Sequence, residues 1–196
     1  KLHAIVDRLV EQAGIKKPKV AVANTDVPNA FATGRGPGNA VICVTTGIRR
    51  RLTEEELEGV LGHELTHVVI RDVQVITLAS FFATVAAMLM QMLFWMGLFG
   101  GMGRSRGGEG GGAGAIMIAY VASVAVYFVA NLLILALSRY REYAADRGGA
   151  ILTGAPSRLA SALEKISGAI ARIPTEDLRK VEGANAFFIV SALKGD

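Results

Sequence analysis

Two of the three histidines in this 196-residue chain lie four residues apart, in the sequence GHELTH at residues 62–67. Side chains at this spacing lie on the same face of an α-helix, one turn from each other. His63 and His67 can therefore bind one tetrahedral zinc ion through their imidazole nitrogens. Glu64 lies about 100° further round the helix, where its carboxylate can act as a general base on water without binding the metal. The spacing predicts zinc-dependent hydrolysis.

A catalytic zinc ion needs a third protein ligand and an open position. The segment REYAAD carries two acidic side chains, Glu142 and Asp146, which are again four residues apart. One of them can bind the metal while the other accepts the N–H of a metal-bound histidine and so fixes the tautomer of that ring. His3 is the alternative third ligand, although its place on the amphipathic N-terminal segment favours a surface position. One zinc ion per chain is expected.

Helices and a small sheet are expected to position these residues. The apolar spacing of residues 1–15 predicts an amphipathic helix that ends near Gly14. Thr53 and Glu56 form a capping box, so a helix begins there and carries GHELTH; the pattern leaves open whether it continues into the apolar segment that follows. Short β-branched runs separated by Pro, Gly and Asn predict a sheet of about three strands, at residues 19–24, 29–34 and 39–48.

Two long segments carry no charged residue: 31 positions from Val73 to Gly103 and 29 positions from Gly110 to Ser138. Roughly 20 apolar residues cross a bilayer as a helix, so each segment is long enough to do so. The glycine-rich stretch at residues 97–114 is expected to connect the two helices. Core helices of a soluble bundle are the alternative, but such helices seldom run so long without a polar stripe.

Basic residues flank the two apolar segments, which by the positive-inside rule places both flanks on the cytoplasmic side of a membrane. These residues are Arg49, Arg50, Arg51 and Arg71 before the first segment, and Arg139, Arg141 and Arg147 after the second. The net charge is +4, but no basic stripe with interleaved aromatic residues is present, so nucleic acid is not an expected partner. The single cysteine, Cys43, excludes an internal disulfide and is expected to be a small buried hydrophobe.

GHELTH, followed by Arg71-Asp72, a hydrophobic hairpin and SRYREYAAD, resembles the HtpX-type membrane zinc metalloproteases, relatives of the type I CAAX prenyl proteases. The resemblance includes PNAFATG at residues 28–34 and covers about residues 1–190. It implies zinc ligands, a catalytic base, a carboxylate that orients a ligand histidine, and an edge strand that binds the substrate main chain by hydrogen bonding. By this resemblance the zinc ligands are His63, His67 and Glu142, and the catalytic base is Glu64. Asp146 is the orienting carboxylate, and Asn29 with Ala30 lie on the edge strand.

The sequence therefore predicts a mainly α fold with a small β-sheet (α+β), in which a zincin-like metalloprotease domain is interrupted by a transmembrane helical hairpin. Residues 1–72 and 139–196 are expected to form the two parts of that domain, and residues 73–138 the hairpin. The resemblance implies a zinc endopeptidase of the cytoplasmic membrane, with its active site facing the cytoplasm. Its substrates would be extended polypeptides, from unfolded or misassembled membrane proteins, in protein quality control and the stress response.

Two other functions remain open from the sequence. One is a CAAX-type prenyl-peptide protease, which differs only in its substrate, and the other is a non-catalytic membrane scaffold in which zinc only joins two helices. Members of the resembled family usually carry further membrane helices before these motifs and, after them, a histidine that stabilises the oxyanion. No histidine follows residue 67 here, so we expect the chain to be part of a longer protein. Arg139, Arg141 and Tyr143 are alternative groups for the oxyanion.

Overall fold

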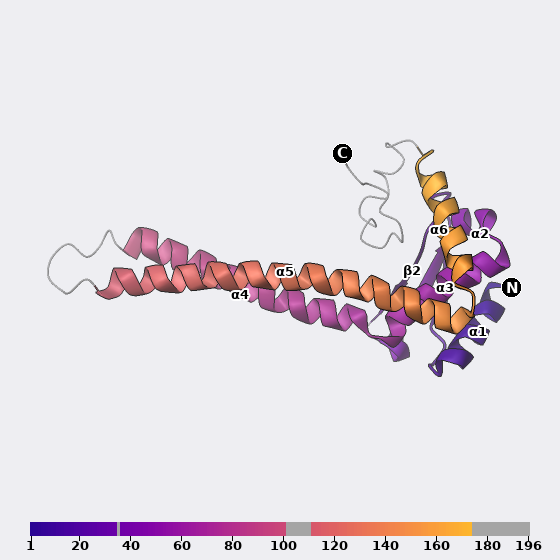
Figure 1. Ribbon diagram of the computed structural model, residues 1–196, viewed down its shortest axis with the longest axis horizontal. Helices are drawn as coiled ribbons and strands as arrows, with labels where there is room; N and C mark the ends of the chain where they lie inside the picture. The colour runs from indigo at the N-terminus through magenta and orange to yellow at the C-terminus, as the bar shows by residue number, and fades with distance from the viewer. Residues whose placement is uncertain (35, 101–110, 174–196) are drawn as a thin grey trace. The chain divides into compact units, whose positions relative to one another are not determined.

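Helices dominate the computed structural model, which describes residues 1–34, 36–100 and 111–173 (Figure 1). In the described part, three short strands form one sheet, so the expected mainly α fold with a small β-sheet is confirmed. The middle of the predicted connector and the C-terminal end of the predicted domain lie outside the described residues. The elements are α1 (Leu2–Ala13), β1 (Lys19–Ala23), β2 (Ala30–Thr33), η1 (Pro37–Asn39), β3 (Val41–Thr45), α2 (Thr46–Arg51), α3 (Glu54–Val69), α4 (Asp72–Gly100), α5 (Gly111–Thr153) and α6 (Pro156–Ile170).

Contacts divide the chain into two compact units. The first unit combines Lys1–Gln74 with the chain from Arg141 onward, and so contains the sheet, α1 to α3, α6 and the C-terminal end of α5. The second unit, Val75–Tyr140, contains most of α4 and the first part of α5. All the residues singled out for zinc chemistry belong to the first unit.

The helices of the second unit are long and apolar enough to cross a membrane, by length and composition. The two candidate spans, Val73–Met96 and Met117–Thr153, contain 24 and 37 residues. Large apolar side chains along them are exposed, including Phe82, Phe128 and Leu133. A core helix of a soluble protein would bury such side chains, so their exposure favours a bilayer as the surrounding medium.

The strand order of the sheet is β1-β3-β2, which makes β2 an edge strand. β1 is parallel to β3, and β2 is antiparallel to it, with Ala30 opposite Val44 and Ala32 opposite Ile42. The Asn29 carbonyl accepts the Thr45 N–H at 2.9 Å, and hydrogen-bonded pairs alternate along an antiparallel ladder. The main-chain groups of Ala30 and Ala32 therefore face the free edge of the sheet.

Helix α3 forms the centre of the first unit. It begins at the predicted capping box, in which Glu56 N donates to Thr53 Oγ1 at 3.3 Å and Thr53 N donates to Glu56 Oε2 at 3.0 Å. α1, α6 and β2 pack against it, and side chains such as Leu61 and Leu65 are fully buried. α3 ends at Val69, because Arg71 has a left-handed φ of 53° before α4 begins. The zinc-motif helix and the first apolar helix are thus separate.

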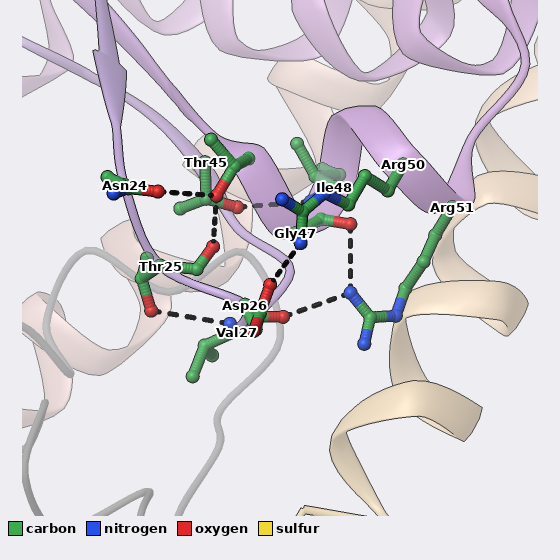
Figure 2. A network of polar contacts seen from close by, with 10 residues as sticks. Asn24, Thr25, Asp26, Val27, Thr45, Gly47, Ile48, Arg50 and Arg51 are labelled. Atoms are coloured by element: carbon green, nitrogen blue, oxygen red, sulfur yellow. Dashed lines mark hydrogen bonds and ion pairs between the residues drawn. The ribbon is translucent and has the colours of Figure 1, made fainter.

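A polar network holds the loop that leads into β2 (Figure 2). The Thr45 side chain caps α2 by accepting the Ile48 N–H at 3.1 Å, and Arg50 forms an ion pair with Asp26 at 2.7 Å. Gly47 N donates to Thr25 O at 2.9 Å, and a Cβ at Gly47 would collide with the Asp26 carbonyl oxygen. The network therefore fixes the path of the chain just before Asn29 and the edge strand that follows it.

The Glu56 carboxylate also joins α3 to α6, which predicts a loss of stability in acid. Its Oε1 accepts from Lys165 Nζ and from Ser161 Oγ, both at 2.6 Å, and these contacts lower the pKa of Glu56 from 4.5 to about 2. A lowered carboxyl pKa stabilises the folded state above pH 4.5, and this contribution is lost as the pH falls towards 2. Since the Lys165 side chain is 47% exposed, we expect a loss of about 1–2 kcal/mol in the free energy of unfolding.

Denaturant unfolding in detergent between pH 5 and pH 2 measures this effect. The Glu56→Gln variant should show a flatter pH dependence than the parent chain. The Glu164→Gln variant, on an exposed position of the same α6, serves as the matched control and should follow the parent. An equally steep acid loss in Glu56→Gln would show that another carboxyl group is responsible.

Candidate active site

Three side chains from α3 and α5 converge at one point of the first unit. His63 Nε2 and His67 Nε2 lie 3.1 Å apart, and Glu142 Oε2 lies 3.6 Å and 3.8 Å from them. Within the described residues, His63, His67 and Glu142 form the group that could hold a metal ion, whereas His3 is exposed on α1 and is not part of it. The structure thus brings together the two histidines and the acidic residue that the resemblance implied as the third ligand.

Small residues allow α5 to approach α3 closely enough for this convergence. A Cβ at Gly149 would lie only 2.9 Å from the backbone N of His63 and 3.0 Å from its Cα. A Cβ at Gly148 would collide with the Thr66 side chain. Glu142 lies two turns before Gly149 on the same helix, so the glycine contact sets the distance between its carboxylate and the histidines.

The donor set and its spacing fit a zinc ion. Two imidazole nitrogens and one carboxylate oxygen are typical ligands of catalytic zinc, and tetrahedral bonds of about 2.1 Å place neighbouring ligand atoms roughly 3.4 Å apart. The observed separations of 3.1, 3.6 and 3.8 Å bracket that value. Two ring nitrogens that both present lone pairs would repel each other at 3.1 Å, and a cation between them removes that repulsion.

Asp146 faces the opposite nitrogen of the His63 ring. Its Oδ1 lies 2.9 Å from His63 Nδ1, although the geometry falls short of a hydrogen bond. A carboxylate at this place favours a proton on Nδ1 and leaves Nε2 as the lone pair for the metal. Burial by itself would lower the pKa of His63, but Glu142, Glu64 and Asp146 together outweigh burial and raise it. Asp146 therefore lies where an orienting partner of His63 would be needed.

Glu64 lies beside this group and is almost fully buried. Its Oε2 accepts a hydrogen bond of 2.9 Å from the backbone N of Ala32 on the edge strand β2. Burial raises the pKa of Glu64, and the nearby His63 and His67 only partly oppose this rise. A carboxylate with a raised pKa is a better proton acceptor, as a general base requires.

Of the predicted substrate residues, Ala30 is the first residue of β2 and Asn29 directly precedes the strand. Asn29 is buried, its N–H donates to Thr45 Oγ1 at 2.9 Å, and its carbonyl accepts from Thr45 N. The main chain of Asn29 is thus directed at β3, whereas the main chain of Ala30 faces the free edge. The role of both residues in substrate binding stays a prediction. The sequence interpretation missed Ala32, although the period of two along a strand places it on the same edge as Ala30.

A hollow opens beside His67, between the edge strand and the end of α3. It is shallow, with a water-accessible volume of about 10 Å³. Its lining residues are Ala32, Thr33, Gly34, Gly36, His67, Val68, Arg71, Val73 and Gln74. One member of the candidate metal group, His67, therefore borders a shallow surface hollow beside the edge strand β2.

Comparison with known proteins finds relatives along the whole of this chain. The chain is 61% identical over 196 residues to a protease HtpX homolog of Moorella thermoacetica, which covers all of this chain and 64% of the relative. It is 56% identical to protease HtpX homolog 2 of Methanosarcina acetivorans, over 99% of this chain and 64% of that protein. Protease HtpX homolog 1 of Streptomyces coelicolor is 52% identical, with coverage of 100% and 62%. The chain thus spans less than two thirds of the length of these relatives.

The similarity extends through both units of the chain. Together with the two apolar helices, the HtpX homologues indicate a membrane protein. Residues 1–191 match peptidase family M48. This match covers the motif helix α3, the candidate spans and the segment of α5 that carries Glu142. The chain belongs to peptidase family M48.

Proposed function

We propose that this chain carries the catalytic unit of a zinc-dependent endopeptidase. The observation that supports the proposal best is the convergence of His63, His67 and Glu142 on one point, with the buried carboxylate of Glu64 beside them. A purely structural ion pair would not need two histidine nitrogens facing each other at 3.1 Å. Nor would it need a buried glutamate that no lysine or arginine of the described residues pairs with.

The chain's own residues supply most of the proposed mechanism. Zinc held by His63, His67 and Glu142 would act as a Lewis acid that polarises the peptide carbonyl and acidifies water. Glu64 accepts a proton from the attacking water as the new C–O bond forms. The same carboxyl group then donates that proton to the peptide nitrogen, so the C–N bond breaks and a neutral amine leaves. Asp146 keeps the proton of His63 on Nδ1 throughout.

The exposure of the site favours catalysis over a zinc staple. The side chains of Glu142 and Asp146 are 59% and 58% exposed, whereas those of His63 and His67 are 7% and 13% exposed. One side of the candidate centre is therefore closed by α3 and the other is open. A structural zinc site normally has four protein ligands and is closed, while a catalytic site keeps one position open.

The edge strand β2 and the basic flanks suggest substrate and location. An unpaired strand edge binds extended polypeptide through main-chain hydrogen bonds, so unfolded or misassembled membrane proteins are suitable substrates in protein quality control. Ala30 faces that edge, and Asn29 precedes it. The arginines on both flanks of the apolar helices favour a cytoplasmic-membrane protein whose site faces the cytoplasm.

Elemental analysis of the detergent-purified chain tests the proposal first. We expect one zinc ion per chain after zinc loading, and its loss in both His63→Ala and Glu142→Ala, since each variant removes one of three ligands. His3→Ala changes an exposed histidine on α1 and should keep the full zinc content.

Cleavage of an unfolded, fluorescently labelled polypeptide should follow the zinc content across these variants. A parent chain that binds no zinc after loading would contradict the proposal. So would a Glu142→Ala variant that keeps both its zinc and its activity.

A further inference from the structure

The hydrogen bond between Ala32 and Glu64 joins the substrate-facing strand to the proposed base. The β2–β3 register and the bonded pair of Asn29 and Thr45 direct the Ala32 N–H away from β3. This N–H therefore contributes nothing to the ladder that holds β2 in the sheet. It donates instead to Glu64 Oε2 at 2.9 Å, across 32 positions of sequence.

The bond leaves the two oxygens of Glu64 in different situations. Oε2 accepts the Ala32 N–H, while no hydrogen bond to Oε1 is found among the described residues. Glu64 is only 6% exposed, and a carboxylate hydrogen-bonded by one N–H has less freedom to rotate about its last side-chain torsion. Oε1 is thus held in one direction and remains available to a proton.

We propose that the backbone N–H of Ala32 is a positioning group for Glu64. It fixes Oε2 and thereby directs Oε1 at the water whose proton Glu64 accepts. This inference rests on the proposed function, because it assigns a purpose to the bond only if Glu64 acts as the base. It also means that an extended substrate cannot use the Ala32 N–H while Glu64 holds its catalytic position, so substrate pairing must rely on other groups of the edge.

Proline at position 32 tests the proposal, since proline removes one N–H and is tolerated where that N–H is not part of a ladder. We expect Ala32→Pro to lower kcat for peptide cleavage at least about 10-fold, because general-base catalysis contributes about 10²- to 10⁴-fold. KM and the zinc content should stay within about 3-fold of the parent, because no ligand and no ladder bond is lost. Ala32→Gly keeps the N–H and removes only the methyl group, so its fall in kcat should be clearly smaller than that of Ala32→Pro.

A second variant covers the case in which proline disturbs the fold. Replacing Ala32 with lactic acid turns the Phe31–Ala32 amide into an ester, which removes the N–H and keeps the methyl group and the shape of the strand. The same loss of kcat at constant KM is expected. A rise of KM with unchanged kcat in the ester variant would overturn the proposal, because the N–H would then bind substrate and not position Glu64.

Hydrogen exchange gives a readout that does not depend on activity. In the parent chain the Ala32 amide should exchange slowly, and Glu64→Ala should accelerate its exchange at least about 10-fold. The Phe31 and Thr33 amides, which face β3, should be unchanged. Equal exchange at Ala32 with and without the Glu64 carboxylate would contradict the bond.

The peptide-cleavage activity of Glu64→Ala, measured alongside, distinguishes a failure of the positioning role from a failure of the proposed function. If Glu64→Ala is inactive while the two variants that lack the Ala32 N–H, Ala32→Pro and the ester, keep full kcat, the positioning role is wrong and the protease function stands. If Glu64→Ala still cleaves polypeptide at the parent rate, the proposed function itself is wrong.

Discussion

Replacing Glu64 with Gln is expected to lower kcat for peptide cleavage by about 10²- to 10⁴-fold, the range that general acid–base catalysis contributes. Glutamine has nearly the same shape, and its carbonyl oxygen can still accept the Ala32 N–H, but it cannot take a proton from water. His63, His67 and Glu142 are untouched, so the zinc content should remain at one ion per chain. Steady-state kinetics on a labelled unfolded polypeptide, with elemental analysis of the same samples, measures both quantities.

The same variant should be at least as stable as the parent chain. In the zinc-free chain Glu64 is buried with no lysine or arginine partner among the described residues, and an ionised carboxylate there is costly to bury, whereas a neutral amide is less so. We therefore expect the thermal unfolding midpoint in detergent to stay constant or rise. Glu142→Gln is the matched control, since it should lose both zinc and activity. Cleavage at the parent rate by Glu64→Gln would exclude Glu64 as the base.

The grouping of the candidate site residues was largely predictable because local helical geometry sets the relative directions of most of them. His63, Glu64 and His67 occupy one stretch of helix, so their relative directions follow from 3.6 residues per turn. Glu142 and Asp146 share a second helix for the same reason. Which of these two approaches the Nε2 atoms of both histidines, and at what distance, depends on how α5 crosses α3, and no local pattern encodes that crossing. The sequence alone therefore left both acidic residues and His3 open as the third ligand.

The sheet shows the same division between local and distant information. Three strands could be predicted from the β-branched runs, and the capping box located the start of α3 at Thr53. The order β1-β3-β2, with the last strand in sequence at the centre, results from long-range pairing. For this reason the edge position of β2 rested on resemblance, and the bond between Ala32 and Glu64 was not foreseen. The bond uses only the backbone N–H of Ala32, so the residue type gives no indication of such a role.

The crossing of α5 over α3 leads to a second prediction, that Gly149→Ala will weaken both folding and zinc binding. The new methyl group would meet the backbone N and Cα of His63 at 2.9 Å and 3.0 Å, and backbone atoms of a buried helix cannot move aside cheaply. Overpacking of this kind costs about 1–3 kcal/mol. Relief requires α5 to move away from α3, which would carry Glu142 away from the two histidines.

Gly168→Ala is the matched control for this experiment, because it makes the same substitution in a helix without the contact. Gly168 is exposed on α6, and a Cβ there meets no atom within 4 Å. Alanine is favoured over glycine in a helix by about 0.5–1 kcal/mol, so Gly168→Ala should raise stability and leave zinc affinity unchanged. Denaturant unfolding should thus show a lower free energy of unfolding for Gly149→Ala and a higher one for Gly168→Ala. Zinc competition with a chelator should show a loss of zinc affinity for Gly149→Ala alone. If Gly149→Ala stabilised the chain as Gly168→Ala does, the close approach of α5 to His63 would be wrong, and with it the reason why Glu142 reaches the metal group.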